Sequence, residues 1–118
     1  AICDKLGKPL VMEEFGYPRD GMKYDLGTPT KWRYGYYKYV FSLVADNAES
    51  GGKFAGCNFW GWGGFAKPLH EQWVVGDPYT NDPAQEAQGL NSVFAGDTTT
   101  LQVVKEQVDR MAKVKNKP

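Results

Sequence analysis

Residues 10–16 read Leu-Val-Met-Glu-Glu-Phe-Gly, an apolar run that ends in two carboxylates and a glycine. A turn signal, Gly-Lys-Pro at residues 7–9, precedes the run, so we predict a β-strand over Leu10–Phe15. Adjacent carboxylates at the end of an apolar strand are costly to bury, because successive side chains point to opposite faces. Glu13 and Glu14 are therefore the first candidates for a functional site.

Alternation along the strand assigns each of these side chains to a face. Leu10, Met12 and Glu14 share one face, and Glu13 lies on the other. If Glu14 points into an interior cavity, Glu13 is expected to point toward the helices that cover the sheet and to need a hydrogen-bond donor there. A pair of glutamates is also common at an exposed strand end, and the dipeptide alone does not distinguish the two arrangements.

Helical and extended patterns alternate in the residues that follow. Residues 16–30 are rich in glycine, proline and aspartate and predict a loop. Thr28 and the following proline are typical of a helix start, and apolar residues then recur at helical spacing, so we predict a helix from Pro29 to Ala48. The apolar run Phe54–Trp62, with glycines interspersed, predicts a second strand that is buried on both faces.

The rest of the chain predicts a long loop and a final helix. Residues 63–96 have neither a helical nor a strand period, and Asp97 can cap a helix that runs to about Val114. Strands that alternate with amphipathic helices indicate parallel pairing, so the fold class is α/β. Two parallel strands need neighbours on each side and cover on both faces, and we therefore expect further polypeptide to complete the sheet.

Composition excludes several classes of function. Fourteen basic and fourteen acidic residues give a formal net charge of +0, which gives no reason to expect nucleic acid or a membrane as a partner. No stretch approaches the roughly 20 apolar residues of a membrane span, and residues 1–8 lack the apolar core of a secretion signal. Without clustered metal ligands or a phosphate-binding loop, we expect no metal and no cofactor. Cys3 and Cys57 are expected to be unpaired buried thiols, with a disulfide as the alternative.

Aromatic residues are the informative excess, at 14% of the chain. Flat rings bind sugars because the C–H faces of a pyranose pack against a π surface, although a ring-rich core is the simpler explanation. Alternation places Trp60 beside Glu14 at the end of the second strand, with Trp62 on the same face. His70 and Trp73 lie in the long loop, where a lone histidine is more often a surface residue than a catalyst.

In these segments the chain resembles glycoside hydrolase family 5. Lys-Pro-Leu-Val-Met-Glu-Glu-Phe-Gly at residues 8–16 and Gly-Cys-Asn-Phe-Trp-Gly-Trp-Gly-Gly at residues 56–64 are similar to strands seven and eight of that family's (β/α)8 barrel. Gly-Asp-Pro from residue 76 and Gln-Gly-Leu-Asn-Ser-Val-Phe at residues 88–94 resemble its endo-β-1,4-mannanases. The resemblance implies that residues 1–118 are the C-terminal portion of one catalytic TIM-barrel domain, incomplete without the preceding six βα units and beginning near helix six.

The resemblance also implies a retaining mechanism on β-1,4-mannosidic bonds. Glu14 matches the family's catalytic nucleophile, Trp60 matches the floor of the subsite for the sugar under attack, and Trp62 is a weaker substrate-binding candidate. The acid/base carboxyl that such enzymes also need is implied outside this chain, as are the arginine and tyrosine that keep the nucleophile ionised. We therefore expect the chain alone to be inactive and to need the N-terminal part of the barrel as its partner. The expected substrate is β-mannan or a manno-oligosaccharide, and the expected location is secreted or periplasmic.

Three other interpretations remain open. A family 5 endoglucanase or another β-glycanase would share the nucleophile, and the products formed from glucomannan and from cellulose would separate them. A non-catalytic carbohydrate-binding module would use Trp60, Trp62 and Trp73, with Glu14 incidental. Such a module would fold and bind sugar as this chain alone. A barrel that has lost its activity would serve as a scaffold.

Overall fold

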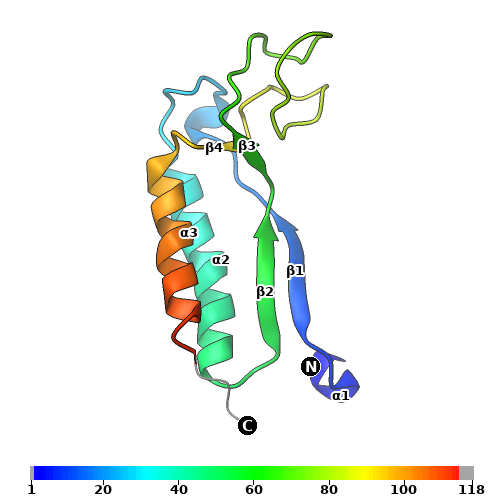
Figure 1. Ribbon diagram of the computed structural model, residues 1–118, viewed down its shortest axis with the longest axis vertical. Helices are drawn as coiled ribbons and strands as arrows, with labels where there is room; N and C mark the ends of the chain where they lie inside the picture. Colours follow the sequence, from blue (N-terminus) through cyan, green and yellow to red (C-terminus); the bar gives the residue numbers. More distant parts are fainter. Residues whose placement is uncertain (1, 115–118) are drawn as a thin grey trace.

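The computed structural model describes residues 2–114, which form helices, strands and loops. The order is α1 (Ile2–Leu6), β1 (Leu10–Phe15), the 3-10 turn η1 (Asp20–Met22), α2 (Lys31–Glu49), β2 (Phe54–Phe59), β3 (Trp62–Gly64), β4 (Val93–Phe94) and α3 (Thr98–Met111). Helices α2 and α3 lie side by side against one face of the β1–β2 sheet (Figure 1). The long loop between β3 and β4 rises beyond the carboxyl ends of the strands.

The two long strands pair as predicted. β1 and β2 are parallel, with Leu10 opposite Phe54 and Phe15 opposite Phe59, and the predicted bounds of the first strand are confirmed. Within residues 2–114 no third strand joins this sheet, and the helices cover only one of its faces. An apolar parallel sheet is normally buried on both faces, so the bare face is where further polypeptide is expected.

The second strand and the long loop differ from the prediction. Pairing with β1 ends at Phe59, and residues Trp62–Gly64 form a separate strand that pairs in parallel with Val93–Phe94. The peptide between Trp60 and Gly61, at the break, is cis. The prediction of one strand over Phe54–Trp62 was therefore wrong, as was the prediction of a strand-free segment from 63 to 96. A two-residue strand has no period, and only its distant partner defines it.

Both long helices form, but neither is capped as predicted. α2 begins at Lys31, and the carboxylate of Asp20 accepts hydrogen bonds from the backbone N–H groups of Lys31 and Trp32, at 2.9 and 3.1 Å. This contact replaces the predicted cap at Thr28. Asp97 lies at the N-cap position of α3, yet its side chain makes no cap bond there. Both caps were predicted from neighbouring residues alone. In the structure, the carboxylate at the start of α2 belongs to Asp20, 11 residues before Lys31, and the carboxylate of Asp97 binds Arg19, 78 residues away.

The core lies between the sheet and the helices. Its buried members are Phe15, Tyr37, Val40, Val93 and Val103, and Met12, Cys57 and Phe59 pack against them. Burial of each large apolar side chain contributes roughly 1.5–3 kcal/mol. Both cysteines are free, as predicted, but each is partly exposed rather than buried. Partial burial raises the pKa of the Cys57 thiol.

Two features are absent from residues 2–114. No helix among them is both long enough and apolar enough to cross a membrane. The same residues contain no group of three or more His, Cys, Asp or Glu side chains arranged to hold a metal ion.

Candidate active site

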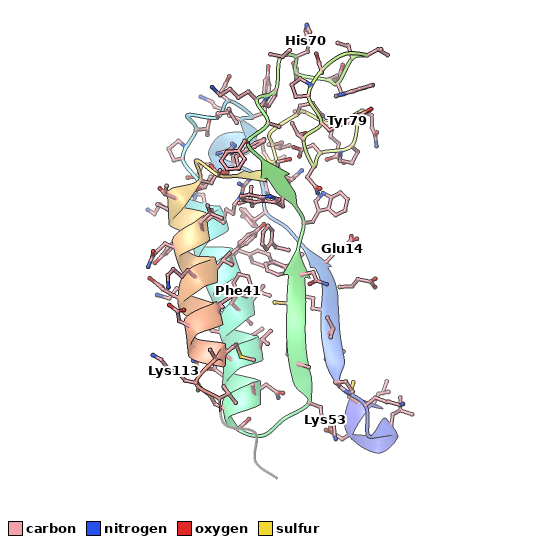
Figure 2. All side chains as sticks on the ribbon, viewed as in Figure 1. Glu14, Phe41, Lys53, His70, Tyr79 and Lys113 are labelled. Atoms are coloured by element: carbon pink, nitrogen blue, oxygen red, sulfur yellow. The ribbon has the colours of Figure 1, made fainter. Side chains whose placement is uncertain are left out.

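Glu14 lies at the carboxyl end of β1, on the side turned away from α2 and α3 (Figure 2). Met12 pairs with Cys57, and Phe15 pairs with Phe59. Three steps along β1 therefore match two steps along β2, so β1 carries one extra residue, a β-bulge. The bulge lets Met12 and Phe15 both pack against the helix-facing core. Their three-residue spacing breaks the strict alternation that was assumed from the sequence.

The bulge changes what was predicted for the two carboxylates. Glu13 and Glu14 are both exposed, and neither carboxylate makes a hydrogen bond or ion pair with the described residues. The expectation that Glu13 faces the helices and needs a donor is therefore wrong, as is the placement of Met12 on the face of Glu14. A one-residue insertion in a strand reverses facing beyond it, and no local sequence feature marks the insertion.

Trp60 is joined to the end of β1 by its backbone. Its N–H donates to the carbonyl oxygen of Phe15 at 2.6 Å. This bond holds Phe15, the residue after Glu14, against Trp60, the residue after β2. A Cβ at Gly16 would lie 2.8 Å from the carbonyl oxygen of Trp60, a distance that real Cβ atoms do not adopt. Gly16 is therefore needed because the two strand ends approach closely at this point, and not only because glycine favours turns.

The two candidate tryptophans remain accessible. Trp60 is 39% exposed and Trp62 is 50% exposed, both far above the core residues. Because β2 ends before Trp60, the two indoles belong to different segments, and the prediction that one strand places them on a common face no longer applies. The structure brings the backbone of Trp60 to the strand that carries Glu14, and it holds Trp62 against β4 through pairing with Val93.

Tyr37 also belongs to this site, although the sequence alone did not single it out. It is fully buried on α2, and its ring packs edge-on against Phe15, with ring centroids 4.9 Å apart. The ring also contacts Phe59, and its hydroxyl donates to the carbonyl oxygen of Trp60 at 3.3 Å. One side chain therefore touches the residue after Glu14, the end of β2 and Trp60. A tyrosine in an apolar helical stripe is the signal that would have indicated it, since a buried hydroxyl needs a partner.

The hydroxyl of Tyr37 predicts a pH dependence of stability. Burial raises its pKa from 10.0 to about 12. Below pH 10 the hydroxyl is protonated in the folded and unfolded chain, whereas between pH 10 and 12 only the unfolded chain ionises. We expect the free energy of unfolding to fall as pH rises through this window, and to fall less in Tyr37→Phe. Urea titrations at pH 9, 10, 11 and 12 measure the difference, and equal slopes in both proteins would contradict it.

A buried charge cluster anchors the loops around the site. The guanidinium of Arg19 is 1% exposed and donates to both carboxylate oxygens of Asp97 at 2.8 Å. Arg33 is fully buried, donates to the carbonyls of Tyr17, Leu90 and Ser92, and lies 3.5 Å from Asp97. Burial, followed by the nearby charge of Arg19, lowers the pKa of Arg33. Arg33 precedes Tyr37 by four residues on the buried stripe of α2, a spacing that would have indicated it.

A second buried carboxylate organises the end of the long loop. Asp82 accepts from the backbone N–H groups of Gly89, Asn91 and Ser92, and from the hydroxyl of Ser92 at 2.5 Å. These bonds close residues 82–92 into a fixed turn just before β4. Together, Asp82 and Asp97 explain how a loop without regular structure keeps one conformation.

His70 lies far from Glu14, at the tip of the long loop (Figure 2). Its Nδ1 is 2.9 Å from Oδ2 of Asp77, and the hydrogen bond from His70 lowers the pKa of the Asp77 carboxyl. This agrees with the prediction that a lone loop histidine is a surface residue. Trp73, which shares the loop, donates its indole N–H to the carbonyl oxygen of Asp77 at 3.2 Å.

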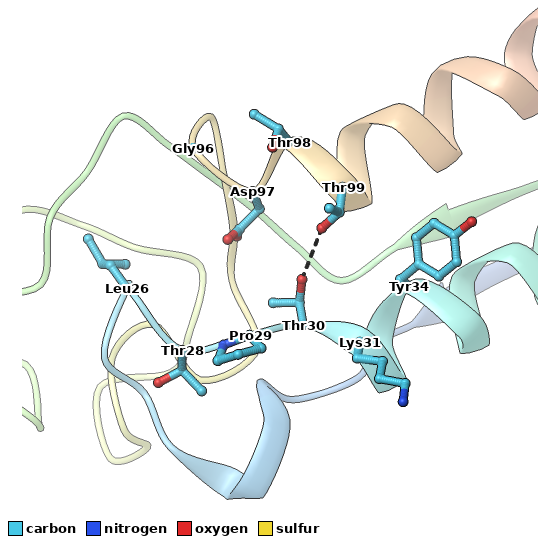
Figure 3. Close-up of a pocket in the computed structure, with 10 residues that line it drawn as sticks. All are labelled: Leu26, Thr28, Pro29, Thr30, Lys31, Tyr34, Gly96, Asp97, Thr98 and Thr99. Carbon is cyan, nitrogen blue, oxygen red and sulfur yellow. Dashed lines mark hydrogen bonds between the residues drawn. The ribbon is translucent and has the colours of Figure 1, made fainter.

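A cavity of about 500 Å³ lies elsewhere, where α2 and α3 begin (Figure 3). Thr30 and Thr99 are hydrogen bonded across it at 3.3 Å, and Lys31, Tyr34 and Asp97 belong to its lining. Neither Glu14 nor either candidate tryptophan borders this cavity. The cavity is therefore separate from the predicted site.

Parallel βα units with a carboxylate at the carboxyl end of a strand are the arrangement from which (β/α)8-barrel enzymes build their active sites. A family model described as glycoside hydrolase family 5 beta-mannosidase-like matches residues 1–116, and the chain belongs to this family. The family and the α/β fold agree with the resemblance found from the sequence.

Solved structures give the same assignment. The chain is similar to the glycoside hydrolase family 5 mannosidase from Rhizomucor miehei, with a TM-score of 0.82 and 34% sequence identity. The alignment covers 94% of this chain and 28% of that one. Two glutamate-to-alanine mutants of that mannosidase, one of them in complex with mannosyl-fructose, match equally well. The chain thus spans little more than a quarter of the length of these structures, and a comparison with curated proteins found no match.

Proposed function

We propose that the chain is part of a retaining glycoside hydrolase that cleaves β-1,4-mannosidic bonds and that Glu14 is its nucleophile. The observation that carries the proposal is the position of Glu14: exposed, at the carboxyl end of β1, on the sheet face that the helices do not cover. Glycosidases of this kind attack the anomeric carbon with one carboxylate while a second carboxylic acid, about 5–5.5 Å away, protonates the leaving oxygen. Membership in a mannosidase-like family supports a mannosyl substrate.

The remaining catalytic groups would lie on polypeptide outside this chain. β1 and β2 would be strands seven and eight of the barrel, with residues 1–118 as the C-terminal portion of one catalytic domain. The six other βα units would supply the acid/base carboxyl and the donors that keep Glu14 ionised, because none of the described residues pairs with it. The chain alone would then be inactive. A polymeric mannan substrate would place the complete enzyme outside the cytoplasm, secreted or periplasmic.

Digestion of defined substrates tests the reaction. With the complete protein, glucomannan and mannan are expected to be cleaved and cellulose to be left intact, with β-configured products at the earliest times by NMR. Cleavage of cellulose with mannan left intact would favour the endoglucanase alternative. Initial α-configured products would contradict retention. The family match over residues 1–116 supports an enzyme over a separate binding module.

Exo-cleavage is a second candidate mode of action. The sequence resemblance favours endo-cleavage within a mannan chain, whereas the family is described as beta-mannosidase-like and one similar mannosidase is in complex with mannosyl-fructose. An endo-acting enzyme would release a range of oligosaccharides from mannan and lower its viscosity early. An exo-acting enzyme would release mannose alone with little early change in viscosity.

Trp60 is proposed as the floor of the subsite at the nucleophile. In Trp60→Ala we expect kcat/KM to fall by about tenfold to a hundredfold, since loss of one stacking ring costs about 1–3 kcal/mol for nucleobases and serves as a scale for sugars. The free energy of unfolding should change less than in a core substitution, because the indole is 39% exposed. Steady-state kinetics with urea unfolding as the control measure both quantities. Unchanged kinetics in Trp60→Ala would show that Trp60 has only a structural role.

A further inference from the structure

The loop between β3 and β4 holds a pair of stacked rings. Trp73 and Tyr79 are parallel within 13°, with centroids 5.4 Å apart. Trp73 is partly buried, whereas Tyr79 is 80% exposed, so one face of the tyrosine rests on the indole while the rest of the side chain is open to solvent. Single exposed aromatic residues are ordinary on protein surfaces, but an exposed ring that is held flat against a second ring is a preformed surface.

The chain on one side of Tyr79 is held by Asp77. The carboxylate of Asp77 accepts from His70 Nδ1 at 2.9 Å and from the backbone N–H of Val74 at 3.2 Å. Its backbone carbonyl accepts the indole N–H of Trp73, also at 3.2 Å. One aspartate therefore fixes both the turn and the orientation of the supporting indole.

The chain on the other side is held equally well. The hydroxyl of Thr80 donates to the side-chain carbonyl of Gln88 at 2.7 Å, and Gln88 is only 2% exposed. The backbone N–H of Asn81 donates to the hydroxyl of Ser92 at 2.8 Å. Because the backbone is fixed before and after Tyr79, a ligand that stacks on the ring pays little conformational entropy.

The same loop is continuous with the proposed subsite at Trp60. A Cβ on Gly61 would overlap the side-chain amide of Asn81, so Asn81 lies directly against the residue that follows Trp60. Tyr79 precedes Asn81 by two residues, which limits the separation of their Cα atoms to about 7 Å. Tyr79 also lies beyond the carboxyl end of β1, toward the same end of the molecule as the loops (Figure 2).

We propose that Tyr79, supported by Trp73, is a stacking platform for a second pyranose unit of the substrate. This unit lies further along the glycan than the unit that is bound at Trp60. The ring face suits the apolar C–H face of a hexopyranose, and its position in a loop next to the strand ends suits an elongated glycan. The assignment rests on the proposed glycosidase function for the identity of the sugar. It adds a subsite that short substrates do not reach.

The test compares substrates of different length in the complete protein. Tyr79→Ala is expected to lower kcat/KM on manno-oligosaccharides of five or six units by about tenfold, and to leave kcat/KM on an aryl mannoside unchanged. Tyr79→Phe keeps the ring and should behave as the wild type. Tyr39→Ala is the matched control, because Tyr39 is 62% exposed on α2 and takes no part in the stack. Equal losses on long and short substrates, or no loss on either, would overturn the platform.

A binding experiment separates failure of the platform from failure of the proposed reaction. Glu14→Gln protein, with and without Tyr79→Ala, is run in native gels that contain mannan, glucomannan, xylan or a soluble β-glucan. Retardation by any of these glycans that is lost with Tyr79→Ala supports the platform, whichever reaction the enzyme catalyses. Retardation that is equal in both proteins, or absent with all four glycans, rejects it.

Discussion

Replacing Glu14 with glutamine in the complete protein is expected to lower kcat by several orders of magnitude while the fold is retained. Glutamine has nearly the shape of glutamate but cannot form the covalent glycosyl-enzyme, so the first chemical step is lost. Because Glu14 is exposed and has no partner among the described residues, the substitution removes no stabilising contact within them. Kinetics on mannan and glucomannan, with circular dichroism as a check on folding, measure this effect.

Glu13→Gln is the matched control for this substitution. Glu13 is equally exposed and unpaired among residues 2–114, so its replacement should change stability by no more than about 0.5 kcal/mol and leave kcat within a few fold. A mannoside that carries fluorine at C2 and a good leaving group should accumulate as a covalent adduct on the peptide containing Glu14. An adduct on Glu13, or lost turnover in Glu13→Gln with normal turnover in Glu14→Gln, would reverse the assignment.

Replacing Asp97 with alanine is expected to cost about 3–5 kcal/mol of unfolding free energy. Asp97 is the partner of the buried Arg19, whose two bonds to it are 2.8 Å long, and it lies 3.5 Å from the buried Arg33. Its carboxylate also accepts the backbone N–H of Phe94 at 2.9 Å. Removal would leave two buried guanidinium groups without their counter-charge and one buried N–H unpaired, and the loops that they anchor would loosen.

A surface ion pair provides the comparison for Asp97. Lys105 and Asp109 form an i, i+4 pair on α3 with both side chains more than half exposed. Asp109→Ala should cost no more than about 0.5 kcal/mol. Asp97→Asn, which keeps an acceptor oxygen but loses the charge, should fall between the two in denaturant titrations. Equal losses for Asp97→Ala and Asp109→Ala would show that the buried cluster contributes nothing beyond a surface pair.

Local sequence patterns were sufficient to predict the helices and strands whose signals lie within a short stretch of the chain. β1 was predicted with its observed bounds, since an apolar run between a turn signal and Gly16 leaves few alternatives. The two long helices follow from apolar residues at helical spacing, and their ends were predicted within three residues. Parallel pairing of the two long strands followed from strand–helix–strand order, because a crossover helix returns the chain in the same direction.

Predictions of side-chain facing and of helix capping failed, because both depend on partners elsewhere in the chain. The bulge between Met12 and Phe15 appears only when β1 is aligned with β2, and it moves Glu13 away from the helix side. Asp97 was predicted as a cap for α3, and its oxygens bind Arg19 instead, 78 residues away. Such competition between a local and a distant donor cannot be judged without the geometry of both.

The amino-acid sequence alone, before any family resemblance selected Glu14, determined the α/β class, the parallel pair of strands and the candidacy of Glu13 and Glu14 at the end of the first strand. These are properties of hydrophobic period and residue order, which a short stretch of chain contains in full. Only the tertiary structure decided that the two carboxylates are both exposed, that Tyr37 joins Phe15 to Trp60, and that Tyr79 is held open against Trp73. The direction in which a side chain points, and the partner with which it forms a hydrogen bond, depend on which groups from distant parts of the sequence come within about 3 Å. Only the folded chain brings those groups together.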